Sequence, residues 1–484
     1  MKRFFSIFVF VLLSLLIVSC QPEKPVTPIK HVDMSGVRFD DLVVEYDGKE
    51  HSIEVKGVVP EEVTVEYINN SMTDAGSIEA TAIFKVKDGY APIESMKAML
   101  TIKKTKPSFE IKFHNDTYEY DGNEHEIKID ESALPDGYKV IYKDNKGLNV
   151  GLYRASATVY DKNHEIELFA TLSIDSRKVH RIDSYDALVK ELSDFKGRTA
   201  ESDLYVLIND IDCSSTTKEN PWKSIGSYAG LKPENGFQSE FDGQGYSINN
   251  LYITEKSDTL VAAGYSTPGF FAGLANAKIH DLVFFNAKID VNAPSDIDVA
   301  VGLICGQSPT CTDIYNITIN GLEINALAKK MHIGAIVGFD QQYQEAADVK
   351  EGVTFLRDNL VVNDLNLMAG LLGDSTNTQR ASCGGIVGEI YNRGPMTYSN
   401  CYVNGALIVK KQETNGSVYI GSIAGLGKDG ATSVIIDGCK SSLKLETDSK
   451  SNSFVKEWVS LTKTDSKLSV SGDSVFCGTI IIPE

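Results

Sequence analysis

Five aspartates come nearest to a catalytic set by type and spacing: Asp210, Asp212, Asp242, Asp296 and Asp298. Paired carboxyl groups can hydrolyse glycosidic bonds, and carboxylates that hold a metal beside a basic residue support elimination from polysaccharides. Asp210 and Asp212 alternate along one expected strand, so both would face the same side. A polar strand edge, a turn at Asp242 and a solvated loop around Asp298 explain the same aspartates without chemistry. We therefore expect no catalytic residue, with a polysaccharide-degrading lyase or hydrolase as the alternative.

Motifs for other chemistries do not occur in the sequence. We find no Ser-His-Asp spacing, no phosphate-binding loop and no His-x-x-x-His pair. Cys-x-x-Cys is missing too, which argues against zinc and thioredoxin-type redox chemistry. His51 and His125 each follow a glutamate at the same place in a duplicated module, beside a turn, which favours a structural role. We expect neither a metal nor a cofactor.

Two long insertions are the stronger candidates for binding. One runs from 339 to 355 and contains Gln341, Gln342 and Tyr343, and the other runs from 368 to 382. Recognition usually resides on long loops carried by a rigid repeat scaffold. A tyrosine among glutamines could dock a sugar, so these three residues form the candidate ligand-binding loop. Surface loops without a ligand are the alternative.

The scaffold itself is indicated by one short pattern in the C-terminal half. Five similar Gly-x-x-x-Gly segments occur between 269 and 425, and Gly478 begins a half-copy. A second short segment rich in β-branched residues follows each full copy. Such periods indicate stacked units that share one core, and the composition favours strands. A pair of membrane helices is excluded, because no apolar run of about 20 residues surrounds any copy.

Asparagines recur at one position of this repeat. Asn316, Asn359 and Asn400 align, with Asp281 and Asp437 beside them. In coils about 4.8 Å apart, each amide would bond to its neighbours above and below. The alignment therefore predicts an asparagine ladder at a stacked turn.

Most cysteines fall in apolar columns of the repeat. Cys383 and Cys477 each precede a repeat glycine, and Cys305 shares its column with valines and alanines. Free cysteine behaves as a small hydrophobic residue, so we expect buried thiols here and at Cys401 and Cys439. One disulfide stays open as an alternative, between Cys305 and Cys311.

The first residues have the features of an export signal. Lys2 and Arg3 precede an apolar run from Phe4 to Val18, which is too short for a typical membrane span. The run ends in Ile-Val-Ser-Cys20, which resembles a bacterial lipobox. That resemblance implies cleavage before Cys20 and attachment of diacylglycerol to its thiol. We expect residues 1–19 to be the signal peptide and the proline-containing segment 20–35 to be a stiff tether.

The net charge of −19 argues against nucleic acid as a partner. The membrane would be contacted only through the lipid of Cys20. The nature of the remaining partner is left open between a glycan and a host protein, and we expect a monomer.

Two copies of one module follow the tether. Tyr46-Asp-Gly-Lys-Glu-His51 matches Tyr120-Asp-Gly-Asn-Glu-His125, and apolar residues alternate with polar ones after each. Alternation and Asp-Gly turns predict small antiparallel β domains. The copies resemble the MBG-type repeat of bacterial surface proteins, also in the Gly-x-Tyr-x-Ala-x-Ala run from Gly151. This resemblance implies spacers at 36–104 and 108–176.

One amphipathic helix is expected from Tyr185 to Phe195, with Ser184 as its N-cap and Tyr185, Leu188, Val189 and Leu192 on one face. We expect it to cover the first end of the stacked sheet. Asn-Asp-Ile-Asp212, Trp222-Lys-Ser-Ile-Gly and Phe241-Asp-Gly-Gln-Gly follow. With the glycine repeats, this order resembles GLUG-motif proteins, which implies a right-handed parallel β-helix over 180–484. The resemblance weakens after 425, and 446–474 shows no clear repeat.

Together these features predict an all-β chain of two β modules and a β-helix with a capping helix. We expect a non-catalytic, lipid-anchored protein of the bacterial outer membrane, exposed on the cell surface as an adhesin or other ligand-binding protein. A structural envelope protein is a further alternative to the enzyme.

Overall fold

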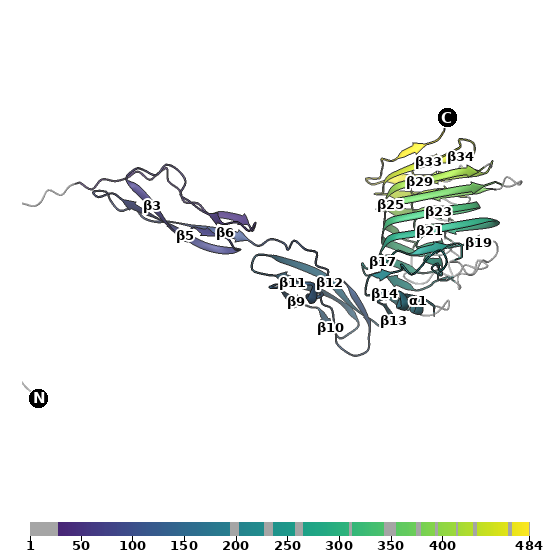
Figure 1. Ribbon diagram of the computed structural model, residues 1–484, viewed down its shortest axis with the longest axis horizontal. Coiled ribbons are helices and arrows are strands. Elements are labelled where there is room, and N and C mark those ends of the chain that lie inside the picture. The colour runs from purple at the N-terminus through teal and green to yellow at the C-terminus, as the bar shows by residue number, and fades with distance from the viewer. Residues whose placement is uncertain are drawn as a thin grey trace, which may run out of the picture. The chain divides into compact units, whose positions relative to one another are not determined.

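The computed structural model describes residues 28–193, 203–226, 236–256, 265–308, 312–342, 355–373, 379–392, 395–412, 415–428, 433–462 and 467–483 (Figure 1). The fold is all-β, as the sequence predicted, and the described residues contain a single α-helix. The chain divides into two compact units. The first contains strands β1 to β6, and the second contains the parallel coil together with part of the second module. The signal segment, Cys20, Cys311 and Tyr343 lie outside the described residues.

The first module is a small, mostly antiparallel sheet. Its strand order is β1-β6-β5-β3, in which β1 and β6 run parallel and the other pairs antiparallel, and β2 pairs with β4. Ala80, Ala82 and Leu100 fill the core without exposure. The strands are β1 (Leu42–Glu45), β2 (His51–Ser52), β3 (Val63–Ile68), β4 (Ser71–Met72), β5 (Gly76–Val86) and β6 (Met96–Lys103).

The second module repeats this topology, with the order β7-β12-β11-β9 and a separate β10-β8 pair. The two histidines make the same contact in both copies, because His51 Nε2 lies 2.8 Å from Asp47 Oδ1 and His125 Nε2 lies 2.9 Å from Asp121 Oδ1. Each ring therefore fastens its own turn, as the structural interpretation predicted. The elements are β7 (Asp116–Glu119), β8 (His125–Glu126), the 3-10 turn Glu131–Ala133, β9 (Lys139–Lys143), β10 (Lys146–Gly147), β11 (Gly151–Tyr160) and β12 (Glu165–Asp175).

The C-terminal part is a β-helix whose described strands pair in parallel, and Figure 1 shows them stacked from β14 toward β33 and β34. A 20-stranded sheet forms most of its wall. Its strands are β13 (Val179–Ile182), β14 (Leu204–Leu207), β15 (Ile211–Asp212), β16 (Glu240–Asp242), β17 (Ser247–Asn249), β18 (Tyr252–Thr254), β19 (Tyr265–Ser266), β21 (Lys278–Val301), β23 (Asp313–Gly334), β25 (Arg357–Leu372), β26 (Arg380–Gly384), β28 (Met396–Ser399), β29 (Tyr402–Gln412), β30 (Ser417–Gly421), β32 (Ser433–Asp437), β33 (Lys440–Thr447), β34 (Ser453–Lys456), β36 (Lys467–Ser471), β37 (Val475–Phe476) and β38 (Thr479–Ile481).

The repeat glycines lead into a second, six-stranded parallel sheet. A Cβ atom on Gly384 would lie only 2.0 Å from the backbone oxygen of Val387, so only glycine lets the turn close this tightly. The sheet contains β20 (Phe271–Gly273), β22 (Cys305–Ser308), β24 (Val337–Gln342), β27 (Val387–Asn392), β31 (Ala424–Gly427) and β35 (Val459–Leu461).

The half-copy at Gly478 is not the sixth rung of this sheet. That rung is β35, and the residues after Gly478 form β38, which pairs with β33 in the large sheet. The prediction was wrong because the Ile-Ile-Ile run imitates a core strand, although Ile480 and Ile481 are exposed. The segment 446–474, which shows no clear repeat in sequence, contributes β34, β35 and β36 to the coil.

The predicted capping helix is α1 (Tyr185–Ser193), which lies beside β13 at the first end of the coil (Figure 1). The Oγ of Ser184 accepts the backbone N–H of Ala187 at 3.3 Å, as an N-cap does. Leu188 and Leu192 enter the core, whereas Val189 is exposed, contrary to the expected apolar face.

The asparagine column has the expected form. Asp281, Asn316, Asn359 and Asn400 all adopt left-handed backbone conformations with φ between 51° and 53°. The Nδ2 of Asn316 donates to Asp281 at 2.9 Å, and that of Asn359 donates to Asn316 at 3.0 Å. Asn400 instead donates to Asp358, and Gly438 rather than Asp437 continues the left-handed column.

Five of the six described cysteines in the coil are free and buried: Cys213, Cys305, Cys383, Cys401 and Cys439. Burial raises the pKa of the Cys213 thiol to about 12. Cys477 was also expected in the core but is exposed. It follows β37 near the last rung, where little chain stacks above it. Cys305 carries no disulfide.

Candidate functional site

The aspartates proposed as catalytic candidates have structural partners. The Oδ1 of Asp210 accepts both the N–H and the hydroxyl of Ser247, each at 2.9 Å. Asp212 accepts hydrogen bonds from Ser214 and from the amide of Asn250. Both carboxylates thus hold turns between neighbouring rungs. Asp298 lies in β21 with Lys330 Nζ at 3.9 Å, and the side chain of Asp296 is outside the described part.

Asp242 belongs to an ionic cluster centred on His280. His280 Nε2 lies 3.1 Å from Glu240 Oε1 and His280 Nδ1 lies 2.8 Å from Asp281 Oδ2, with Asp242 at 3.6 Å. Burial opposes the charged ring, but hydrogen bonds to Asp281 and Glu240 raise the pKa of His280 to about 10. Burial raises the pKa of Asp242 to about 6. His280 is therefore an imidazolium that compensates neighbouring carboxylates.

The spacing in this cluster would also fit a metal ion, because ligand atoms of Asp242, His280 and Asp281 lie within 4.8 Å of one another. Both nitrogens of His280 are already engaged with carboxylates. Arg177 adds a second cation, since its Nη1 donates to Glu240 at 2.8 Å. Despite burial, these bonds hold the pKa of Glu240 at about 2. Glu240 and Asp281 thus have protein cations as partners.

The predicted binding loop is only partly described. Gln341 belongs to β24, is buried, and accepts a hydrogen bond from the amide of Gln307 at 3.1 Å. It is therefore buried against the neighbouring rung, and its burial does not fit the exposed binding loop that we expected. The side chain of Gln342 and all of Tyr343 lie outside the described residues, so their role in binding stays a prediction.

Two clusters of charged groups are buried in the coil. Arg357 contacts Asp340 through two bonds of 2.7 and 3.0 Å, and neither side chain is exposed. The hydroxyl of Tyr398 also donates to Asp340. In the second cluster, Glu389 lies 2.8 Å from His332 Nδ1 and 3.0 Å from Arg380. Burial opposes ionisation of Glu389, but its contacts with His332 and Arg380 hold its pKa below the usual range. The Arg357–Asp340 pair is closed to solvent and has no access for a ligand, whereas the side chain of Arg380 is 26% exposed.

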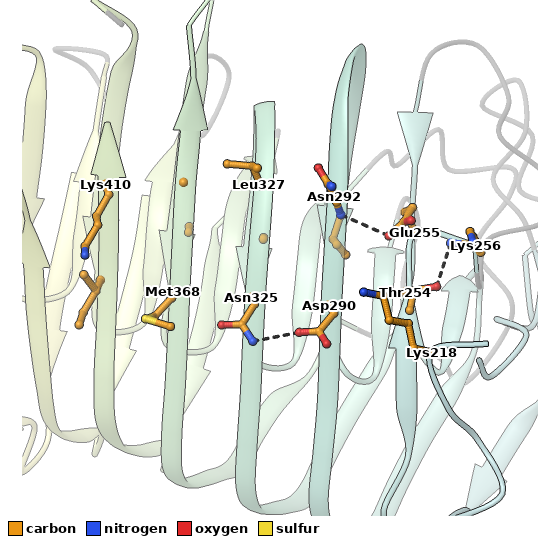
Figure 2. A pocket seen from close by; sticks show the side chains of 15 residues that line it. Lys218, Thr254, Glu255, Lys256, Asp290, Asn292, Asn325, Leu327, Met368 and Lys410 are labelled. Atoms are coloured by element: carbon orange, nitrogen blue, oxygen red, sulfur yellow. Dashed lines mark hydrogen bonds between the residues drawn. The ribbon is translucent and has the colours of Figure 1, made fainter. Parts of the chain in front are cut away.

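A groove of about 460 Å³ crosses the outward face of the large sheet (Figure 2). Side chains from β18, β21, β23, β25 and β29 line it, so it extends over five adjacent parallel strands. This size is typical of small-molecule and oligosaccharide sites. The bounds of the insertion expected at 368–382 were wrong, because residues 368–372 belong to β25 and residues 380–382 to β26; Met368 lines the groove as an outward residue of β25.

Two columns of aligned residues form the floor of the groove. In the first, strand register places Thr254, Asp290, Asn325, Met368 and Ile408 in one row. In the second it aligns Asn292, Leu327, Gly370 and Lys410. Residues i and i+2 of a strand face the same side, which is why β21, β23, β25 and β29 each supply one residue to each column. The groove therefore offers both polar and apolar contacts along its length.

The carboxylates of the groove already have partners. Asp290 accepts the hydroxyl of Tyr252 and the amide of Asn325, the latter at 2.9 Å. Glu255 accepts the backbone N–H of Asn292 at 3.2 Å. Burial and the bond to Asp290 raise the pKa of Tyr252 above its ordinary value. These acids are thus fixed in hydrogen bonds within the wall.

Three lysines occupy the two ends of the groove. Figure 2 shows Lys218 and Lys256 at one end and Lys410 at the other. All three are exposed. Within the described part of the chain, none of their ammonium groups has a carboxylate partner. The groove therefore presents free positive charge in a chain whose net charge is −19.

Sequence reasoning missed this groove. Its residues are outward positions of strands separated by roughly 35 to 43 residues in the chain, as Asp290 with Asn325 and Asn325 with Met368 show. The alternation of β21, β23 and β25 could have identified outward positions. Their alignment into columns required the strand register, which unequal connections hide.

No family model matches this chain. Halomucin from Haloquadratum walsbyi is 24% identical over 316 residues, which cover 63% of this chain and 3% of that protein. The chain thus spans a small fraction of that relative. One similar solved structure is a SusE-like, surface-located polysaccharide-binding protein from the heparin utilisation locus of Bacteroides thetaiotaomicron, with 12% identity, a TM-score of 0.13, and coverage of 31% of this chain and 37% of that one. Neither similarity defines a family.

Among the described residues, no helix has the length and apolar character needed to cross a membrane.

Proposed function

We propose that this chain is a non-catalytic, lipid-anchored bacterial surface protein whose groove binds an extended glycan. The groove carries the proposal, because it is open along five parallel strands and offers polar and apolar groups in two regular columns. Rungs about 4.8 Å apart repeat at a spacing close to that of sugars in an extended chain. A linear polysaccharide can therefore repeat its contacts from strand to strand.

The absence of catalysis is part of the proposal and is supported by the hydrogen bonds of the acids in the groove. Asp290 and Glu255 are held by Tyr252, Asn325 and Asn292. A general acid or base must be able to exchange a proton with its substrate, and these carboxylates stabilise the wall instead. Asp210 and Asp212 have comparable structural bonds. We therefore favour binding over cleavage.

The proposed attachment to the outer membrane is supported by the segment ending at Cys20, which resembles a lipobox. The two β modules, whose strands lie between Leu42 and Asp175, would then serve as a spacer between the lipid and the coil. Radiolabelled palmitate should enter the wild-type chain and not a Cys20→Ala variant. Proteolysis of intact cells should remove the coil from their surface. Protection from protease in intact cells, with digestion after lysis, would place the coil in the periplasm and contradict surface exposure.

Binding is tested with the full chain, purified in detergent, against a panel of neutral and charged polysaccharides. Leu327→Ala with Met368→Ala should weaken binding about tenfold, because both side chains face the groove. Leu468→Ala with Val470→Ala is the matched control, since both are exposed apolar residues of β36 outside the groove. Equal affinity of both double variants, or no binding to any glycan, would refute the proposed site. Release of shortened products would indicate the enzyme instead.

A further inference from the structure

We infer that the groove selects polyanionic glycans, those that carry uronate or sulfate groups, through Lys218, Lys256 and Lys410. This assignment rests on the glycan-binding role proposed above and adds the chemical class of the ligand. The first observation is the placement of charge. Three ammonium groups and two carboxylates line the groove, while acidic residues outnumber basic ones in the whole chain.

The second observation is the difference in pairing. Both carboxylates of the groove accept hydrogen bonds from groups of the wall. Lys288 also lies 3.7 Å from Asp290, which compensates that charge further. The three lysines at the ends have no such partners among the described residues. The lining holds three ammonium groups against two carboxylates, so its excess charge is positive, and a neutral glycan would leave that excess uncompensated.

The third observation is the distance between the two ends. Lys256 follows β18, and Lys410 lies in β29, four strand spacings further along the sheet. Four spacings correspond to about 19 Å. An extended glycan with an anion at two sites that far apart can contact both ends at once. Between them, the amide of Asn292 and the amide oxygen of Asn325 can bond to hydroxyl groups, while Leu327 and Met368 face the sugar rings.

Lysine serves such a ligand well, because its flexible stem lets the ammonium reach anions at variable positions. Exposed ion pairs of this kind are individually weak and are screened by salt. Selectivity should therefore depend on all three lysines together and should fall as ionic strength rises.

The test compares dextran sulfate and polygalacturonate with neutral dextran, using the full chain in detergent. We expect the anionic polymers to bind at least tenfold more tightly than dextran at low salt. The triple variant Lys218→Ala, Lys256→Ala, Lys410→Ala should lose about tenfold in affinity for them, and the corresponding arginine variant should retain it. The matched control removes the same charge at exposed positions of the coil outside the groove, by Lys440→Ala, Lys450→Ala and Lys467→Ala.

The outcomes separate the inference from the proposed function. Binding of dextran and the anionic polymers with equal affinity would overturn the charge selectivity while the glycan-binding role stands. Binding of none of them would overturn both. Equal losses in the groove and control triples would show a general charge effect and contradict the site. Binding of polyphosphate as tight as that of dextran sulfate would show that the groove recognises charge without sugar, and would also overturn the inference.

Discussion

Charged side chains are paired inside the coil, whereas lysines in the groove on its outer face are exposed and have no partner among the described residues. Inside, Arg357 and Asp340 are fully buried and bonded to each other, and Tyr398 completes the set. In the groove, Lys218 and Lys410 are exposed and have no carboxylate partner within the described residues. A buried charge without a partner would destabilise the fold strongly, whereas an exposed one is hydrated at little cost. The groove can therefore keep free charge for a ligand, and the interior cannot.

Breaking the interior pair should produce the largest effect. We expect Arg357→Met to lower the free energy of unfolding by about 3–5 kcal/mol, because the buried carboxylate of Asp340 loses its partner. Urea unfolding of the coil can be followed through Trp222 and Trp458, the only two tryptophans of the chain, both in its core. As a control, Lys288→Met removes the exposed pair with Glu323 and should cost less than about 1 kcal/mol. Similar losses of unfolding free energy in both variants would contradict the expected difference between buried and exposed ion pairs.

A change of pH tests the His280 cluster. Its exposure to solvent is greater than that of the interior Arg357–Asp340 pair and less than that of the groove lysines. The folded pKa of about 10 exceeds the ordinary value of about 6.5. The charged ring therefore stabilises the fold fully below pH 6.5, and this contribution is lost as the pH rises through 10. Between pH 7 and pH 9 the loss should be about 2–3 kcal/mol. His280→Gln should remove this slope, and a slope unchanged in the variant would assign it to other groups.

The asparagine ladder tests a smaller, uncharged contribution. Asn316→Ala should cost about 1–2 kcal/mol, because it removes bonds to Asp281 and Asn359 and places alanine in a left-handed conformation. Asn316→Gly keeps that backbone accessible and should recover part of the loss. Thermal unfolding of both variants separates the cost of the lost hydrogen bonds from the cost of the left-handed backbone conformation. If glycine is no better than alanine, the backbone conformation contributes nothing measurable.

Much of this architecture is predictable from sequence, because local patterns determine it. The spacing of Gly302, Gly334 and Gly384 indicates the rungs, since a side chain at these positions meets backbone atoms. Asn316 and Asn359 mark the stacked turn for a similar local reason. The half-copy at Gly478 shows where prediction from local sequence fails. A run of isoleucines has the same pattern whether it lies at the open end of the coil or in its core. Burial there depends on whether another rung follows.

The groove was not predictable in the same way. Thr254, Asp290 and Asn325 become neighbours only through strand register, and the connections between their strands differ in length. The prediction for Gln341 failed for a related reason. Its polar side chain is typical of a loop residue, but it is buried and bonded to Gln307 on the neighbouring rung. In both cases the partner lies one rung away, at a distance along the chain that the local pattern does not encode.

Removal of the groove lysines should have the smallest effect on stability and a clear effect on binding. We expect Lys218→Ala, Lys256→Ala and Lys410→Ala each to change the free energy of unfolding by less than about 0.5 kcal/mol. Their ammonium groups are exposed and make no ion pair with a described residue, so the fold loses nothing when they are removed. Urea unfolding measures this directly. A loss comparable to that of Arg357→Met would mean that these lysines hold the wall together, and their charge would then not be free for a glycan.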